Sequence, residues 1–187
     1  AMQAQINPHF LYNTLDSIAW LSRDGKNQSV VEMVQALTTF FRTGLSRGRD
    51  IITVAEEARH VRSYLTIQKM RYAQQFDYML YVDPAVESCA VPKLILQPLV
   101  ENALYHGIKT CQHKCMLFVN VLGVEDGVLF EILDNGVGMP PDKLRALQNA
   151  LERTGGKRAE SFGMLNVYDR IRALTRGRFS FRIQSEE

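Results

Sequence analysis

Length, composition and charge place the chain among globular proteins of ordinary make-up. It has 187 residues, 46% of them hydrophobic and 22% charged, which suits one large domain or two small ones with a buried core. A net charge of +2 favours neither a nucleic-acid-binding nor a membrane-binding surface. No signal peptide and no apolar run of membrane-spanning length is visible, and three cysteines predict a reducing compartment rather than a disulfide framework.

Two amphipathic helices are predicted at the start of the chain, over residues 3–22 and about 28–46. Gly25 is the expected end of the first helix, so the two form an αα-hairpin. A hairpin alone leaves much of its apolar surface in water, and pairing with a second copy as a four-helix bundle would bury that surface. The apolar positions are Leu11, Leu15 and Ile18 in the first helix and Val30, Val34, Leu37, Phe41 and Leu45 in the second.

Helices and strands then alternate. A basic, turn-rich break at 46–50 precedes a capping box, Thr53 to Glu56, that starts a helix to about Tyr72. Further helices are predicted at about 93–106, opened by Val91-Pro92, and at 140–151 and 163–175; strands are predicted at 76–82, 114–123, 128–133 and 179–183. The pattern predicts an α+β chain, with a helical module followed by an α/β sandwich.

Asn102 and His106 lie four residues apart and are expected to share one face of the 93–106 helix. An amide oxygen is a suitable hard ligand for Mg²⁺, which bridges to phosphate oxygens. Taken alone, this pair is best interpreted as two polar residues on a helix surface. The interpretation as a Mg²⁺ site is strengthened only by the sequence thirty residues further on.

Asp134 follows the apolar strand 128–133 and precedes Asn-Gly-Val-Gly. A carboxylate at a strand end can accept the exocyclic amine of adenine, whereas guanine presents an acceptor there. Gly136 and Gly138 permit positive φ and let a base approach the backbone. The alternative is an ordinary turn, because Asn-Gly is a common turn dipeptide.

Gly163 opens the helix 163–175, and the amides of its first turn can face phosphates. Residues 140–162 would then form a lid, with Lys157 and Arg158 as phosphate contacts, and a solvated loop is an equally good interpretation of these two charges. The chain contains neither GxxxxGK[ST] nor the HRD and DFG motifs of protein kinases.

His9 shares a helix face with Gln5, Asn13 and Asp16. A neutral imidazole on such a face can supply a nucleophilic nitrogen, although a single exposed histidine more often has no function. Cys111, His113 and Cys115 bring three soft-metal ligands together, but their alternate spacing is not a usual zinc pattern and a fourth ligand is missing. Incidental loop or edge-strand residues are therefore the favoured interpretation of these three.

Five stretches together resemble sensor histidine kinases of the LytS/YesM type, a branch of the two-component kinases. They are QINPHFLYNTL (5–15), YLTIQKMRY (64–72), PKLILQPLVENALYHG (92–107), DNGVGM (134–139) and FGMLNVYDRI (162–171). They occur in the family's order and span nearly the whole chain. This combination is highly specific.

The resemblance implies ATP-dependent autophosphorylation on His9, with transfer to an aspartate of a response regulator. Asn102 matches the family's Mg²⁺-binding asparagine. Asp134, Gly136 and Gly138 match its adenine-binding motif, and Gly163 matches the glycine motif at the end of the lid. Asn13 would orient water for the reverse dephosphorylation. Family members are usually membrane receptors that act as homodimers, so the chain resembles the cytoplasmic portion of a cell-membrane sensor, with no direct contact to nucleic acid.

The expected division is a dimerisation and phosphoacceptor hairpin at 1–50, a connecting helix at 51–75 and a GHKL (Bergerat) ATP-binding domain at 76–187, with 46–50 as hinge. Three departures matter: Ser161-Phe-Gly stands where the family often has Gly-x-Gly, the usual last Gly-Thr strand is missing, and Phe10 stands where many histidine kinases have an acid, as is normal for this branch. The first two favour slightly the alternative of a degenerate, non-catalytic signalling module. A GHKL chaperone or topoisomerase fragment is a third possibility, but those proteins lack an Asn-Pro-His helix before the ATP domain.

Overall fold

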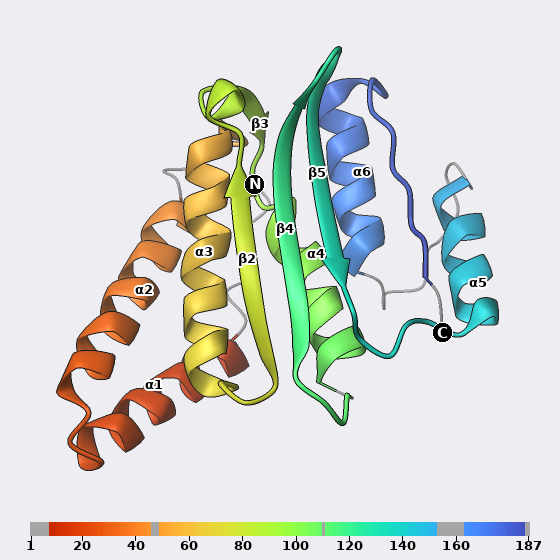
Figure 1. The fold of residues 1–187 in the computed structure, drawn as a ribbon. Coiled ribbons are helices and arrows are strands. Elements are labelled where there is room, and N and C mark those ends of the chain that lie inside the picture. Colours follow the sequence, from red (N-terminus) through yellow and green to blue (C-terminus); the bar gives the residue numbers. More distant parts are fainter. Residues whose placement is uncertain (1–7, 46–48, 110, 153–162, 186–187) are drawn as a thin grey trace.

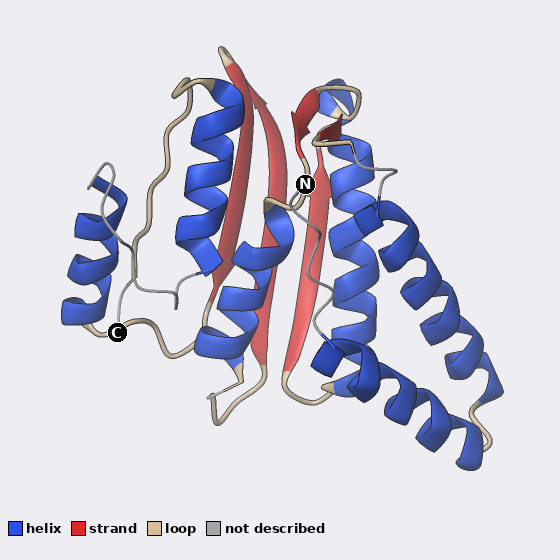
Figure 2. Cartoon of the chain, turned by 180° about the vertical axis from the view of Figure 1, so that it is seen from behind, coloured by secondary structure: helices blue, strands red, loops and turns tan. Residues whose placement is uncertain are grey.

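A three-stranded sheet with helices on one face forms the centre of the molecule (Figure 1). The computed structural model describes residues 8–45, 49–109, 111–152 and 163–185. Seen from behind, helices α3, α4 and α6 lie across the sheet, and α1 and α2 pack outside α3 (Figure 2). None of the described helices combines the length and apolarity that crossing a bilayer requires.

The predicted hairpin is present as α1 (Pro8–Arg23) and α2 (Asn27–Leu45), and residues 3–7 of the first predicted helix lie outside the described ranges. Gly25 joins the helices with φ 70°, a left-handed conformation that favours glycine. Phe10 anchors α1, since its ring lies 5.0 Å from that of Phe40 and 5.3 Å from that of Tyr64. The hairpin is thereby packed on α3 as well as on itself.

The capping box predicted at Thr53 is confirmed. The Thr53 hydroxyl accepts from the Glu56 amide at 3.1 Å, and the Glu56 carboxylate accepts from the Thr53 amide at 2.9 Å. These bonds satisfy donors at the start of α3 (Val54–Arg71) that the helix itself leaves unpaired. The preceding strand β1 (Ile51–Thr53) was not predicted from the sequence.

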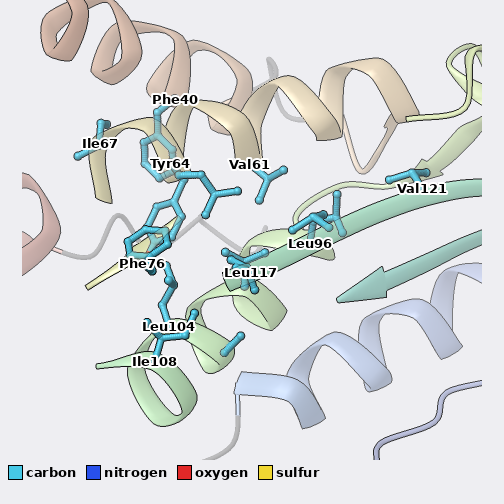
Figure 3. Close-up of a cluster of buried hydrophobic side chains, with 14 of the residues drawn as sticks. Phe40, Val61, Tyr64, Ile67, Phe76, Leu96, Leu104, Ile108, Leu117 and Val121 are labelled. Carbon is cyan, nitrogen blue, oxygen red and sulfur yellow. The ribbon is translucent and has the colours of Figure 1, made fainter. Parts of the chain in front are cut away.

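The mixed sheet is confirmed, in the order β2-β4-β5. β2 (Phe76–Val82) runs parallel to β4 (Cys115–Val124), and β4 pairs antiparallel with β5 (Gly127–Asp134). Alternate side chains of these strands face the helices, and β4 buries Cys115, Leu117, Val119 and Val121 completely. Figure 3 shows side chains from α2, α3, β2, α4, η3 and β4 meeting in this core.

The helix predicted from residue 93 begins later than expected. Val91 and Pro92 belong instead to β3 (Ala90–Pro92), which follows a 3-10 turn η2 (Pro84–Val86) and pairs antiparallel with β1. Leu94 has φ 56°, which interrupts any helix at that point. Helix α4 therefore spans only Leu96–Asn102, and the chain continues as a π-helical segment, η3 (Ala103–Ile108).

A buried carboxylate fixes the start of α4. Glu57 of α3 has no solvent exposure and accepts three backbone bonds of 2.8 Å from the amides of Leu94, Ile95 and Leu96. Burial raises the pKa of Glu57, and the three amides oppose that rise. A side chain of α3 thus supplies the N-terminal cap that α4 lacks in its own sequence.

The last part of the chain forms a second, smaller core. Helix α5 (Pro141–Glu152) and helix α6 (Gly163–Thr175) bury Leu147, Leu151, Met164 and Leu165 against each other. The strand predicted at 179–183 is wrong, because this segment is extended but joins no sheet. It packs instead through Phe179 and Phe181, whose rings lie 5.1 and 5.9 Å from that of Tyr168.

The Glu57 cap predicts a large loss of stability on substitution. Glu57→Gln leaves a neutral side chain with one acceptor oxygen facing three buried amides, so we expect a loss of about 2–3 kcal/mol in urea unfolding. Glu56→Gln is the matched control, because a half-buried glutamine at this position still closes the capping box and loses only an Arg49 contact worth below ~1 kcal/mol. Equal losses in the two variants would contradict this account of α4.

Candidate nucleotide and phosphoacceptor site

Asp134 is the last residue of β5, and its carboxylate lies against the backbone of two other segments. Oδ1 accepts from the Gly136 amide at 2.9 Å. Although the residue as a whole is exposed, local desolvation of the carboxylate raises its pKa, and the Gly136 bond opposes that rise. Oδ1 is thereby held by the turn, and the carboxylate keeps further acceptor capacity.

Gly107 brings η3 into contact with Asp134. A Cβ on Gly107 would lie 2.5 Å from Asp134 Oδ1, and one on Gly136 would lie 2.4 Å from the carbonyl carbon of Gly107. The Gly107 carbonyl also accepts from the Val137 amide at 3.1 Å. Only glycines permit this approach, so the end of η3 and the turn after β5 form one rigid unit around the carboxylate.

Asn102 and His106 lie on either side of the junction between α4 and η3. Asn102 ends α4 and is half-buried, whereas His106 lies within η3 and is exposed. A π-helix has more residues per turn, as the i→i+5 bond from the Lys109 amide to the Leu104 carbonyl shows at 2.9 Å. The two residues therefore lie on either side of the change from α-helical to π-helical turns.

The other predicted nucleotide contacts are only partly described. Gly138 has φ 72°, the left-handed conformation for which glycine was expected. Gly163 begins α6, and both views place that end of α6 at the end of the sheet where β5 finishes (Figures 1 and 2). Lys157 and Arg158, like Ser161, lie outside the described residues.

His9 lies in the first turn of α1 and is exposed. The side-chain nitrogen of Asn13 lies 3.1 Å from the ring nitrogens of His9, one helical turn away. The neighbouring Phe10 is 5% exposed and fixes this turn against α2 and α3. The start of α1 and the end of β5 lie at the same end of the sheet in both views (Figures 1 and 2).

His60 joins the hairpin to the sandwich. One of its ring nitrogens lies 2.9 Å from Thr43 Oγ1 of α2, and the other lies 2.7 Å from Gln97 Oε1 of α4. Its ring stacks on Phe40 at 4.5 Å, and burial lowers its pKa, which favours the neutral imidazole. A single α3 residue thus touches α2, the second helix of the hairpin, and α4, the helix that carries Asn102.

Three residues of this arrangement were missed from the sequence. Gly107 had a visible signal, because a glycine inside a helical pattern often marks close backbone approach. Glu57 and His60 had no such signal. The partners of Glu57 are 37 or more residues away along the chain, and those of His60 are 17 and 37 residues away. Sequence periodicity does not report contacts of that range.

Comparison with known proteins agrees with this arrangement of elements. Residues 1–76 match the family model described as histidine kinase, and residues 91–187 match that of histidine kinase-, DNA gyrase B- and HSP90-like ATPases. Sensor histidine kinase YesM of Bacillus subtilis is 38% identical over all 187 residues. The chain belongs to the LytS/YesM sensor histidine kinases. Its α/β sandwich is of the Bergerat type found in that ATPase family.

Two further relatives bear similar names. Sensor protein LytS of Bacillus cereus is 32% identical over 187 residues, and sensor histidine kinase YpdA of Escherichia coli is 30% identical over 175 residues, or 93% of the chain. The chain spans about 30% of the length of these relatives, 30% of YesM, 31% of LytS and 30% of YpdA. The similarity therefore concerns one region of longer sensor proteins.

The contact between Gly107 and Asp134 predicts a specific steric effect. Gly107→Ala would place a methyl group 2.5 Å from Oδ1 and force η3 away from β5, with a loss of about 1–3 kcal/mol in thermal unfolding. Gly127→Ala, at the other end of β5, meets nothing within 4 Å and is expected to change stability by less than ~0.5 kcal/mol. Indistinguishable melting curves for the two variants would show that the contact is not tight.

Proposed function

We propose that the chain is the catalytic portion of a sensor histidine kinase, in which His9 takes the γ-phosphoryl group of ATP and passes it to an aspartate of a response regulator. Family membership supports the activity. The observation that carries it is the Asp134 carboxylate, held between the Gly107 and Gly136 backbones with acceptor capacity left for a ligand.

The polarity of this site suits adenine. An ionised Asp134 accepts hydrogen bonds, and the exocyclic amine of adenine donates one, whereas guanine offers an oxygen at that position. Because Gly107 and Gly136 carry no side chains, the backbones of η3 and of the turn after β5 close directly on the carboxylate and hold it in place for the base. The amides at Gly163, at the same end of the sheet, would then face the phosphates.

The donors at this end of the sheet also fit Mg²⁺. The half-buried Asn102 offers one hard amide oxygen, and Mg²⁺ commonly takes few protein ligands and completes its shell with phosphate oxygens and water. When bound, the ion would neutralise charge on the phosphate oxygens. His106, exposed on η3, is proposed to contact the nucleotide rather than the ion, and Lys157 is proposed to contact a phosphate.

In the transfer step, a ring nitrogen of His9 forms a bond to the γ-phosphorus while the bond from phosphorus to the bridging oxygen breaks and ADP leaves. Such transfer is mostly a matter of positioning. Asn13 would hold the imidazole edge, and Phe10 fixes the turn that carries it. Residues 46–50, between the hairpin and the rest of the chain, are the proposed hinge that lets the two sites meet.

We infer that the chain acts as a homodimer through its hairpin, on the cytoplasmic side of a membrane-anchored sensor. Helix α2 buries Met33, Ala36 and Phe40 toward the core but leaves a second apolar stripe outside. Exposed apolar side chains on the hairpin include Tyr12 (66%), Leu15 (47%), Trp20 (58%), Val31 (48%) and Val34 (43%). A second hairpin packed on this stripe would complete a four-helix bundle.

Autophosphorylation tests the proposed function directly. With γ-labelled ATP, the parent chain should gain acid-labile label. His9→Ala should carry at least about 100-fold less label while still binding ATP. Asp134→Asn should bind ATP about 10–100-fold more weakly, because an acceptor becomes a donor. Asp126→Asn, on the exposed turn before β5, is the matched control and should behave as the parent. ATP binding without any label on His9 would favour a non-catalytic signalling module instead.

The dimer is tested at the stripe. Val34→Glu places a charge in the proposed interface and should convert the dimer to monomer in light scattering after gel filtration, with unchanged helix content. Gln35→Glu adds the same charge at the adjacent exposed position and should leave the mass unchanged. A Val34→Glu protein that keeps the dimer mass would place the interface elsewhere.

A further inference from the structure

Three metal-ligating side chains come together between the end of η3 and the first residue of β4. The thiols of Cys111 and Cys115 and the imidazole of His113 have ligand atoms that all lie within 4.8 Å of one another. Cys115 Sγ is 3.7 Å from His113 Nε2. Although their alternate spacing is not a usual zinc pattern, residues 112–113 form a bend, and the three ligand atoms lie close together.

The distances suit a tetrahedral ion. Zinc bonds of about 2.3 Å to sulfur and about 2.0–2.1 Å to nitrogen put neighbouring ligand atoms roughly 3.6–3.8 Å apart. The sulfur-to-nitrogen distance of 3.7 Å is already in that range. Closing the other pairs from within 4.8 Å requires shifts of about 1 Å or less, which rotation of an exposed His113 and a half-buried Cys111 can provide.

Without a metal, these thiols make only weak bonds. Cys111 Sγ donates to the Gly107 carbonyl at 3.3 Å, and Cys115 Sγ lies 3.6 Å from its neighbour's carbonyl at His113 and 3.7 Å from that of Asn135. Thiols are poor donors, so exchanging these contacts for metal–sulfur bonds loses little. Two of these backbone groups belong to Gly107, which packs on Asp134, and to Asn135, which follows it, so an ion here would adjoin the proposed nucleotide site.

We propose that Cys111, His113 and Cys115 bind one borderline-soft divalent cation of the Zn²⁺ class, with water in the fourth position. Two thiolates and an imidazole select such an ion over Mg²⁺, which prefers oxygen ligands such as Asn102. This site is therefore distinct in both residues and chemistry from the proposed magnesium site. It needs neither ATP nor kinase activity to be occupied.

Cobalt substitution tests the site on the whole 187-residue chain, with a phosphine reductant keeping the thiols reduced. Titration with Co²⁺ should give a thiolate-to-cobalt charge-transfer band that saturates at one ion per chain and disappears when Zn²⁺ is added. Cys111→Ser and His113→Asn, at half-buried and exposed positions, should each weaken cobalt binding by at least about tenfold, since even supporting partners of a metal site contribute 10–100-fold.

Cys89→Ser is the matched control, because Cys89 is a half-buried thiol outside the cluster, and its titration should equal that of the parent. The proposal is overturned if the parent shows no saturable thiolate band, or if the Cys111 and His113 variants titrate like the parent. These readouts are independent of phosphorylation. A failed kinase assay and a failed metal assay therefore remain distinguishable.

Discussion

The carboxylate of Glu57 is the contact on which the arrangement of the site depends. The chain must reverse from β3 into α4 through Leu94, whose positive φ prevents a regular helix start, and this leaves three amides without local partners. Glu57 accepts all three from the neighbouring helix. Burying a carboxylate costs free energy unless hydrogen bonds satisfy its oxygens. The three amide bonds to Glu57 satisfy them only when α4 lies in this one position on α3.

Because its start is fixed, α4 also determines where the segment that follows it meets the sheet. Its continuation as a π-helical segment ends at Gly107 and Ile108, where the backbone touches Asp134 and the turn after β5. π-helical turns are rare overall but frequent at functional sites, and this one directly follows Asn102. The half-buried Asn102 and the Asp134 carboxylate thus belong to one continuous support that begins at Glu57.

The sequence predicted the features that depend on local chemistry. The capping box at Thr53, the strand 76–82 and the β4–β5 hairpin were found because hydroxyls, turn residues and period-two alternation act over a few residues. The segment 179–183 shows the same alternation, yet its apolar side packs on Tyr168 and no strand pairs with it. Here the alternation indicates that one side of the segment is buried, not that the segment is hydrogen-bonded in a sheet. β1 and β3 are three residues each and stabilise one another across the chain, which no local pattern reveals.

The hairpin and the ATP-binding sandwich share helix α3, and this gives a physical route between them. Phe10, beside His9, packs on Tyr64, while His60, one turn earlier, bridges α2 to Gln97 at the start of α4. A shift of α2 would change the Thr43–His60 contact and the stacking on Phe40 at the same time. Since α4 is bound to α3 through both Glu57 and His60, repacking of the hairpin would reach the helix of Asn102 through short, directional bonds, which resist small displacements more than apolar contacts do.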